Sequence, residues 1–525
     1  MTQTKIAYPF EHLETGLTPD QVDVFKSLVR EVIENPNHLE EQKRLALTDA
    51  AFKTLPYLPV SDDALAALGS GEICLLGEGP APYHPRYVAP DYEKLLREGS
   101  AFFDLAPASD LYEAVTSLLT VYNYSPTSGA PPFIGKLDEL LEPFLDGLTD
   151  EQARPVLKSF WTLIDRLHPD AFVHSVLGPQ GSRAGRLLLA VDREVQTITN
   201  MTLRYDPENT PRDFALLAVG NAMQLSKPYF LNHPLHEAEW GEDYIVASCY
   251  NIMVLRGGIF TLVRANLGEV AKRFDGTLED LLENHLPRLA EIQIEIINSR
   301  INHLVEEVGW FDQSIFIKEG LLDPEKFTAY AGVVGLNELV NRVMELEGRP
   351  DAKLGHAEVA NQTALKILST FKEQLLSHPS PYCRGTDGHV TFHAQVGISE
   401  DEGTTPGCRI PAGTEPDLYA HLQAAAPIQS LVEGGVSDIF EFDQTAKENP
   451  EAILDIIDGA MALGMRDLSL GSTDSEYVRV SGYLVRRCDL ENRQEEKLLR
   501  HDTAHIAREF FNSQPNTLHR RERQV

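Results

Sequence analysis

Five cysteines supply the most versatile chemistry in this sequence: Cys74, Cys249, Cys383, Cys408 and Cys488. Their number is odd, their spacings are wide and no Cys-x-x-Cys pair occurs, which argues against a disulfide framework and against a zinc site of four thiolates. We therefore expect reduced thiols of the kind found in cytosolic proteins, and we predict no bound metal.

A second chemical signal lies near the C-terminus, within residues 475–487. The pentapeptide Arg479-Val480-Ser481-Gly482-Tyr483 resembles the Arg-Val-x-Gly-Tyr signature of glycyl radical enzymes. A radical at a glycine Cα becomes planar and is delocalised over the two flanking peptide groups, whereas a Cβ would crowd that centre. The resemblance implies that Gly482 stores an unpaired electron, and the alternative is a glycine that marks a turn or bulge in a strand.

A stored glycyl radical needs a cysteine that it can convert to a thiyl, and the family carries that cysteine on a loop inside its barrel. Cys249, in residues 247–251, is the best match, because the strand that follows it ends in Asn266-Leu-Gly268, as in anaerobic ribonucleotide reductases. Cys383 and Cys408 are alternatives, since an adjacent arginine can lower a thiol pKa. Cys74 is interpreted as apolar packing. Cys488 follows Gly482 too closely for the family's geometry.

Further segments resemble the same reductases in the same order: 197–203, 332–338, 409–416 and 449–453. Together the similarity covers about residues 75 to 490 and looks closest to the YjjI-like glycyl radical enzymes. It implies a ten-stranded α/β barrel of two five-stranded halves, ringed by helices, in which the loops of Cys249 and Gly482 meet. It also implies a homodimer without a bound cofactor. A separate radical SAM activase, dependent on S-adenosylmethionine and an iron–sulfur cluster, would install the radical.

The departures from better-known relatives bear on the reaction. Anaerobic ribonucleotide reductases carry four zinc-binding cysteines just before the glycine, but residues 468–474 contain none, and residues 1–70 resemble no nucleotide-binding cone. Pyruvate formate-lyase uses two adjacent cysteines, whereas Cys249 lies between Ser248 and Tyr250. The dehydratases place a glutamate two residues after the cysteine as a general base, where this chain has Asn251.

Three functions therefore stay open. The first is a glycyl radical enzyme of unassigned substrate, whether lyase, dehydratase or reductase. The second is a reductase of a nucleotide or sugar phosphate. The third is a radical-accepting repair or scaffold protein, which the barrel-length chain and Cys249 argue against.

Several polar side chains are candidates for the substrate pocket: Asn251, Asn337, Glu338, His389, His393, His84 and Arg86. Glu338 is the first candidate for a general base. His389 and His393 would share one face of a strand, as a pocket wall, a metal pair or an ordinary hydrogen-bonded pair. His84 and Arg86 lie in a proline-rich loop that lines a site or simply covers the surface. Arg86 and Arg256 would suit a carboxylate or phosphate.

The elements that must position these residues follow from periodicity and breakers. A helix is expected over 18–33, with Thr18 as its cap and proline next to it, and another over 278–307, divided by Pro287. Strands are expected over 187–191, 260–264 and 389–396, and an irregular loop over 77–90. The economical organisation is a helical N-terminal region (1–70), a barrel with the cysteine loop (71–470) and a C-terminal glycyl radical segment (471–525).

Charge and hydropathy narrow the partners and the location. The 525 residues hold 46 Lys and Arg against 79 Asp and Glu, a net charge of −33, which disfavours nucleic acid and anionic membranes. No run of about 18 apolar residues and no secretory signal occurs, so we expect a cytoplasmic protein. A small anionic substrate is compatible with this charge, because an arginine cluster in a pocket overrides the global sign.

Overall fold

The computed structural model describes residues 19–52, 54–76, 78–125, 133–167, 174–247, 250–394, 403–494, 498–499, 511 and 515–525. Three helices come first: α1 (Pro19–Glu34), α2 (Glu40–Phe52) and α3 (Asp62–Ser70). The helix predicted over residues 18–33 is confirmed as α1 from Pro19 on, and its expected cap, Thr18, lies outside the described residues. Ser61 caps α3 by accepting a hydrogen bond from the amide of Ala64.

A five-stranded sheet follows the path β1–β9–β10–β11, with β2 also paired to β9. The strands are β1 (Ile73–Cys74), β2 (Tyr87–Val88), β9 (Gly258–Asn266), β10 (Phe327–Val334) and β11 (Thr391–His393). The last three run parallel to one another. All residues of β9 and β10 are buried, because a parallel sheet is covered on both faces. The strand predicted at 260–264 is confirmed within β9. The strand predicted over 389–396 is confirmed only at Thr391–His393, because residues 389, 390 and 394 lie outside β11 and residues 395–396 lie outside the described part.

A seven-stranded sheet has the order β16–β12–β13–β6–β5–β4–β3. Its strands are β16 (Glu522–Arg523), β12 (Asp438–Phe442), β13 (Asp467–Ser472), β6 (Tyr229–Asn232), β5 (Asn200–Tyr205), β4 (His174–Leu177) and β3 (Phe133–Lys136). Only the β13–β6 pair is antiparallel among these described strands. The two short hairpins β7 (Tyr244–Ala247)–β8 (Asn251–Val254) and β14 (Tyr477–Arg479)–β15 (Leu484–Arg486) belong to neither sheet.

The predicted strand at 187–191 is wrong, because these residues form the middle of helix α8 (Arg183–Val195). A run of five apolar residues is too short to distinguish a strand from a buried helix by periodicity. The flanking signals decide it: Ser182 accepts a hydrogen bond from the amide of Gly185 as the helix cap, and the polar residues on both sides extend the helix.

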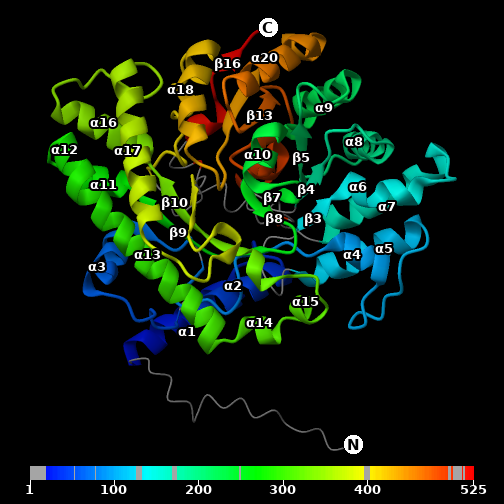
Figure 1. Ribbon diagram of the computed structural model, residues 1–525, viewed down its shortest axis with the longest axis horizontal. Helices are drawn as coiled ribbons and strands as arrows, with labels where there is room; N and C mark the ends of the chain where they lie inside the picture. Colours follow the sequence, from blue (N-terminus) through cyan, green and yellow to red (C-terminus); the bar gives the residue numbers. More distant parts are fainter. Residues whose placement is uncertain are drawn as a thin grey trace, which may run out of the picture.

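Helices cover the outer faces of the two sheets, as Figure 1 shows, with α11, α13, α16 and α17 beside β9 and β10 and with α6 to α9 beside β3 to β6. The helix predicted over 278–307 is confirmed as α12 (Leu278–Asp280), η4 (Leu281–His285), α13 (Leu286–Asn302) and η5 (His303–Glu307), with Pro287 in the first turn of α13. The remaining helical elements are α4 (Tyr92–Glu98), α5 (Leu111–Tyr124), α6 (Leu137–Leu141), η3 (Glu142–Leu145), α7 (Asp150–Leu167), α9 (Arg212–Leu225), α10 (His233–Trp240), α11 (Leu267–Arg273), α14 (Trp310–Gln313), α15 (Ile315–Lys318), η6 (Pro324–Lys326), α16 (Leu336–Leu346), α17 (Glu358–Ser377), η7 (Arg384–Thr386), α18 (Leu418–Ser430), α19 (Thr445–Glu448), α20 (Pro450–Ala462), α21 (Arg487–Gln494) and η8 (Pro515–Leu518).

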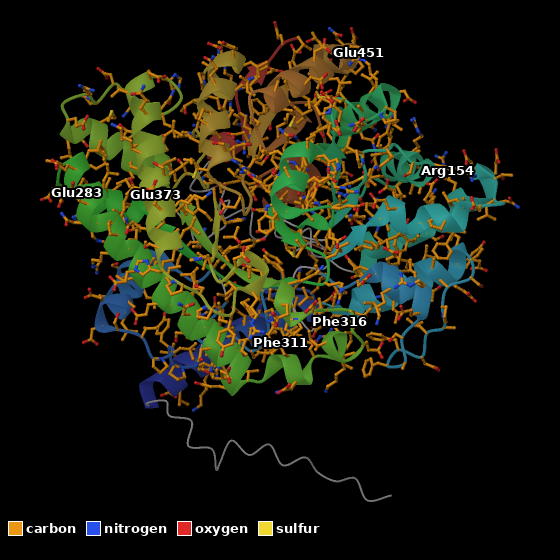
Figure 2. The ribbon with its side chains drawn as sticks, viewed as in Figure 1. Arg154, Glu283, Phe311, Phe316, Glu373 and Glu451 are labelled. Atoms are coloured by element: carbon orange, nitrogen blue, oxygen red, sulfur yellow. The ribbon has the colours of Figure 1, made fainter. Side chains whose placement is uncertain are left out.

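The mixed α/β class is confirmed, but a closed ten-stranded barrel of two five-stranded halves is not. Among the described residues, no strand of one sheet pairs with a strand of the other. The hairpin β7–β8 contacts β3 and β4 on one side and β9 on the other, so it lies between the two sheets. Charged side chains cover the periphery, and Arg154, Glu283 and Glu451 lie at the outer edge in Figure 2.

Candidate active site

Gly482 lies at the tip of the hairpin β14–β15, where it is buried. The amide of Val480 donates a 3.1 Å hydrogen bond to the carbonyl of Tyr483, which closes the turn. The side-chain amide of Asn200, on β5, donates to the carbonyl of Gly482 itself.

Arg479 fixes the hairpin from its inner side. Its guanidinium is 2% exposed and donates to the carbonyl of Ser226 through Nε at 3.0 Å and through a terminal nitrogen at 2.6 Å. The same terminal nitrogen donates to the Oδ1 atom of Asn200 at 3.2 Å, and the guanidinium lies 5.4 Å from the ring centre of Tyr229. Because Oδ1 of Asn200 accepts this hydrogen bond from Arg479, Nδ2 of Asn200 points toward Gly482. Asn200 was not among the predicted site residues, although it lies in the segment 197–203 that resembles the reductases.

The other residues of the motif close the site to water. Val480 and Tyr483 are fully buried in an apolar cluster with Ile198, Leu225 and Val485. Arg520 donates to the carbonyl of Val480 at 3.3 Å. Exclusion of solvent suits a centre that must survive as a radical, because stray hydrogen donors would quench it.

Cys249 and its neighbour Ser248 lie outside the described residues, between Ala247 and Tyr250. The residues on either side are fixed. Ala247 pairs with Asn251 across the hairpin β7–β8, and Nδ2 of Asn251 donates to the carbonyl of Ala247 at 2.9 Å. Tyr250 is fully buried with φ 64°, a value rarely adopted by residues other than glycine. The described residues on both sides of Cys249, Ala247 and Tyr250, are therefore fixed in position.

Tyr250 connects this turn to the glycine hairpin. Its hydroxyl donates to the carbonyl of Ser481 at 2.9 Å and lies 2.7 Å from the hydroxyl of Ser469 on β13. Its ring packs edge-on against Tyr229 at 4.7 Å, and the guanidinium of Arg409 lies 5.8 Å from its centre. The residue after Cys249 is thus bonded to the residue before Gly482.

A glycine pair packs against the same turn from the other side. The amide of Ile252 donates to the carbonyl of Gly434 at 3.0 Å, and the amide of Ala394 donates to the carbonyl of Gly435 at 3.1 Å. Gly435 has φ 134°, and a Cβ there would overlap the carbonyl of Tyr250 and lie 3.1 Å from Nε2 of His393. Glycine is therefore required at this contact for both its conformation and its size.

Of the predicted pocket residues, Asn251, His393 and Arg86 come close to the hairpin β7–β8. His393 ends β11, is fully buried and stacks on Tyr330 with ring centres 4.8 Å apart. Burial, and then the nearby cations Arg86 and Arg264, lower the pKa of His393 to about 3, so the ring is neutral. Nδ2 of Asn251 lies 3.3 Å from the hydroxyl of Tyr87.

Arg86 belongs to a buried charge cluster at the edge of β9. Its terminal nitrogen donates to Glu78 at 2.8 Å, and Glu78 also accepts from Arg300 at 2.9 Å. Burial opposes the charge on Glu78, but Arg86 and Arg300 outweigh it and lower the pKa of the carboxyl. The single carboxylate of Glu78 therefore balances one of the two guanidinium charges in this cluster.

Other predicted pocket residues lie elsewhere. Asn337 and Glu338 begin α16, and Glu338 accepts from the amide and hydroxyl of Thr405 at 3.1 and 2.5 Å. His389 precedes β11 instead of sharing a strand face with His393, and it lines a separate pocket of about 590 Å³ with Glu239, Lys372 and Glu433. The ring of His84 contacts the carbonyl of Pro85 at 2.7 Å. Their assignment to a substrate pocket stays a prediction.

The alternative cysteines are not activated by their neighbouring arginines. Burial raises the pKa of Cys383 to about 12 and also raises that of Cys408. Arg384 is paired with Glu325, and Nε of Arg409 donates to the carbonyl of Ser437 at 2.6 Å. The expectation that an adjacent arginine would lower either thiol pKa is therefore wrong. Cys488 is exposed and Cys74 is half-buried on β1.

An acid that no motif indicated lies near the hairpin. Asp467 is fully buried at the start of β13, on the same face as Ser469, and neither carboxyl oxygen has a hydrogen-bond partner. Burial raises the pKa of this carboxyl well above its ordinary value. Nε2 of His236 lies 3.9 Å from Oδ2 of Asp467, and the ring of His236 stacks on Tyr244 of β7.

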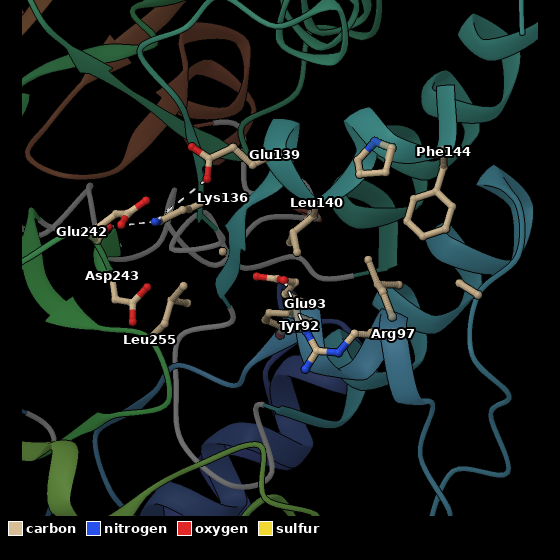
Figure 3. Close-up of a pocket in the computed structure, with 14 residues that line it drawn as sticks. Tyr92, Glu93, Arg97, Lys136, Glu139, Leu140, Phe144, Glu242, Asp243 and Leu255 are labelled. Carbon is tan, nitrogen blue, oxygen red and sulfur yellow. Dashed lines mark hydrogen bonds and ion pairs between the residues drawn. The ribbon is translucent and has the colours of Figure 1, made fainter. Parts of the chain in front are cut away.

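A pocket of about 460 Å³ opens at the base of the same hairpin, between α4, α6 and the residues that flank β7 and β8 (Figure 3). Lys136 donates to the carbonyl of Glu242 at 2.8 Å and lies 3.9 Å from Glu139. Burial, and then Arg204, lower the pKa of Lys136. The lining contains no residue of the glycine hairpin.

No group of three histidine, cysteine, aspartate or glutamate side chains is placed to hold a metal ion in the described part of the chain. None of the described helices has the length and apolar character needed to cross a membrane.

Comparison with known proteins gives a consistent result. The model of the family "Glycyl radical enzyme YjjI-like" matches residues 39–523. The chain is 39% identical over 465 residues to the protein YjjI of Escherichia coli K12, covering 88% of this chain and 89% of the relative. A Haemophilus influenzae protein is 36% identical over 485 residues, covering 90% and 93%.

Solved structures show the same fold at low identity. The anaerobic ribonucleotide reductase of Thermotoga maritima in complex with dATP and CTP has a TM-score of 0.63 and 11% identity, over 90% of each chain. The same reductase with glycerol in its active site has a TM-score of 0.63 and 10% identity, over 90% of this chain and 89% of that one. At this identity the likeness shows a shared fold.

Proposed function

The chain belongs to the YjjI-like family of glycyl radical enzymes, and we propose that it stores its radical on Gly482 and uses Cys249 as the thiyl that attacks a small organic substrate. The observation that carries this assignment is the hydrogen bond between Tyr250 and Ser481. It joins the residue after the cysteine to the residue before the glycine. No such bond links Cys383 or Cys408 to the glycine hairpin among the described contacts.

The proposed cycle begins when the activase removes one hydrogen atom from Cα of Gly482. The glycyl radical then takes the hydrogen atom of the Cys249 thiol, which restores glycine and leaves a thiyl. The thiyl takes a hydrogen atom from a substrate C–H bond. After the substrate radical has reacted, the product radical recovers that hydrogen from Cys249, and the thiyl regenerates the radical on Gly482. Each transfer requires its two atoms to lie about 3–4 Å apart.

Residues around the pair have supporting roles in this proposal. Asn200 and Arg479 hold the Gly482 turn, and Tyr250 and Gly435 hold the Cys249 turn. Asp467, a carboxyl on β13 whose pKa is raised by burial, is a better candidate for proton transfer than Glu338, which accepts hydrogen bonds from Thr405. The burial of Gly482 means that the hairpin β14–β15 must leave its site for the activase to reach Cα.

The test is an anaerobic electron paramagnetic resonance spectrum of the chain activated by a cognate radical SAM enzyme. We expect a doublet from the single α-hydrogen of Gly482, absent in Gly482→Ala. Thiol hydrogens exchange with water, so reversible transfer between Gly482 and Cys249 should replace the α-hydrogen with deuterium in D₂O and collapse the doublet. This readout needs no substrate.

Matched cysteine variants identify the thiyl. The doublet should persist in D₂O for Cys249→Ser, whereas Cys383→Ser and Cys408→Ser should collapse it as the parent does. Collapse in Cys249→Ser would overturn the assignment of the cysteine. The absence of any doublet, with an activase shown to cleave S-adenosylmethionine, would overturn the assignment of Gly482.

Substrate, assembly and location complete the proposal. The reaction type stays open among lyase, dehydratase and reductase, and a reductase of a nucleotide or sugar phosphate is the alternative, tested by turnover of those compounds after activation. A repair or scaffold protein would hold the radical without turnover.

We propose a cytoplasmic homodimer, to be checked by cell fractionation and by light scattering.

A further inference from the structure

Three neighbouring strands place Arg264, Gly332 and His393 side by side. Gly332 of β10 is in register with Arg264 of β9 and with His393 of β11. Residues in register on parallel strands project from the same face of the sheet. A Cβ on Gly332 would lie 2.9 Å from Cγ of Arg264, so the glycine leaves room for the arginine side chain to lie across β10. The strands thereby bring a guanidinium and an imidazole onto one surface, which we call the β9–β11 wall.

The β9–β11 wall faces the hairpin of Cys249. Tyr330, two residues before Gly332 and on the same face, donates to the carbonyl of Ile252 on β8 at 2.5 Å. Leu262, two residues before Arg264, packs in one apolar cluster with Tyr250 and Ile252. The side chains of Arg264 and His393 therefore point toward the hairpin β7–β8.

His393 has unused hydrogen-bonding capacity on this wall. It is 0% exposed, and neither ring nitrogen has a hydrogen-bond partner. A buried polar atom left without a partner is costly, so such atoms in a native site indicate a missing ligand or water. The stack on Tyr330 fixes the ring plane, and a neutral ring offers one donor and one acceptor. Oδ1 of Asn251, also buried and without a partner, supplies a further acceptor.

Two cations lie near His393 in the part of the chain that the structure describes. Both charged groups that act on its ring are cations, Arg86 and Arg264. Arg86 pairs with Glu78, and Arg264 of β9 is a second guanidinium on this wall, fully buried. A guanidinium in low-dielectric surroundings binds carboxylate or phosphate oxygens strongly and with defined geometry.

We propose that the β9–β11 wall binds the oxyanion of a small hydroxylated substrate, with Arg264 facing the oxyanion and with His393 and Asn251 bonding the oxygens beside it. The ligand chemistry is a carboxylate or a phosphate on a short hydroxylated carbon chain. The inference rests on the proposed function in one respect, because the thiyl is what would act on the bound molecule.

Three matched three-carbon compounds test the site by isothermal titration calorimetry on the unactivated full-length chain: glycerol, glycerate and glycerol 3-phosphate. We expect glycerate or glycerol 3-phosphate to bind at least 10-fold more tightly than glycerol, and the tighter of the two identifies the oxyanion. Equal affinity for glycerol, or binding of none of the three, would overturn the proposal.

Variants of the wall and of the surface distinguish binding at this site from a general effect of the charge of the protein. Arg264→Gln should weaken oxyanion binding about 10- to 100-fold, the range for hydrogen bonds to charged groups. His393→Phe, which keeps the stack on Tyr330, should weaken it about 3- to 10-fold. Arg288→Gln removes one charge from a guanidinium that is 45% exposed on the outside of α13 and should leave affinity unchanged. Equal effects of the buried and the surface arginine would refute a specific site.

Circular dichroism checks that each variant is folded. If Arg264→Gln does not fold, His393→Phe still tests the proposed site. Because calorimetry uses the unactivated protein, its result is independent of the glycyl radical spectrum. A missing doublet would overturn the proposed function but not the oxyanion site. If none of the three compounds binds, the oxyanion site is overturned and the proposed function is unaffected.

Discussion

The hydroxyl of Tyr250 donates a 2.9 Å hydrogen bond to the carbonyl of Ser481, although 231 positions separate the two residues in the chain. The bond connects the tip of the hairpin β7–β8 to the tip of the hairpin β14–β15. In the proposed mechanism it sets the distance between the thiol of Cys249 and Cα of Gly482, so its loss should affect hydrogen transfer more than folding.

Tyr250→Phe removes only this hydroxyl. We expect the radical to form on activation but the doublet to collapse in D₂O about 10-fold more slowly, because the two turns are less well aligned. The free energy of unfolding should fall by about 0.5–1.5 kcal/mol. Tyr205→Phe is the control, since its hydroxyl also donates one hydrogen bond, to Asp458 at 2.5 Å, away from both hairpins. An unchanged rate in Tyr250→Phe would contradict the positioning role.

Asn200→Ala removes the side chain that joins Arg479 to the carbonyl of Gly482. The buried guanidinium then loses a partner, at a cost of about 1–3 kcal/mol, which should open the glycine hairpin more often than the rest of the protein. Amide hydrogen exchange measured by mass spectrometry should be at least about 10-fold faster in peptides that contain residues 480–486.

Asn221→Ala is the matched control for that experiment. Asn221 is equally buried and donates to the carbonyl of Leu189 at 2.8 Å, between α8 and α9. Its removal should lower stability without selective exchange in the glycine hairpin. Equal exchange profiles in the two variants would show that Asn200 has no special relation to Gly482.

Gly435→Ala and Gly459→Ala form a pair with opposite expected effects. A Cβ at Gly435 overlaps the carbonyl of Tyr250, and its φ of 134° is unfavourable for alanine, so we expect a loss of more than about 3 kcal/mol. Gly459 lies within α20 with nothing within 4 Å of a Cβ, so alanine there should stabilise by about 0.5–1 kcal/mol. Urea unfolding measures both, and equal small effects would argue against the tight contact at Tyr250.

His393 should contribute to acid sensitivity. Its pKa is about 3 in the folded chain against an ordinary value of 6.5, so between these values the unfolded chain binds a proton that the folded chain does not. Stability is therefore unaffected above pH 6.5 and falls as the pH drops below it, by at most about 1.4 kcal/mol per pH unit.

Non-titrating substitutions test this contribution. His393→Gln and His393→Phe should both reduce the slope of unfolding free energy between pH 6 and pH 4, whatever their effect on stability at pH 7. Urea unfolding at pH 7, 6, 5 and 4 gives that slope. A slope identical to that of the parent chain in both variants would show that His393 titrates normally in the folded protein.

Features that short stretches of the chain encode could be predicted without the structure. The pentapeptide around Gly482 indicated the family, and caps, breakers and apolar periodicity indicated α1, the helix through Pro287 and strand β9. Where the local pattern was ambiguous, as in the five apolar residues 187–191, it predicted a strand in place of α8. The closed barrel was expected from the resemblance to the family. Closure depends on pairing between strands far apart in the chain, and among the described residues no such pair joins the two sheets.

Only the tertiary structure brought together the parts of the site. Asn200 reaches Gly482 because β5 passes beside the last hairpin, and Gly435 is essential because of a carbonyl 185 positions earlier in the chain. Arg264, Gly332 and His393 become neighbours through strand register alone. Such contacts depend on how distant strands align, and a hydrophobic pattern read along one segment specifies which face of a strand is buried but not which strand lies next to it.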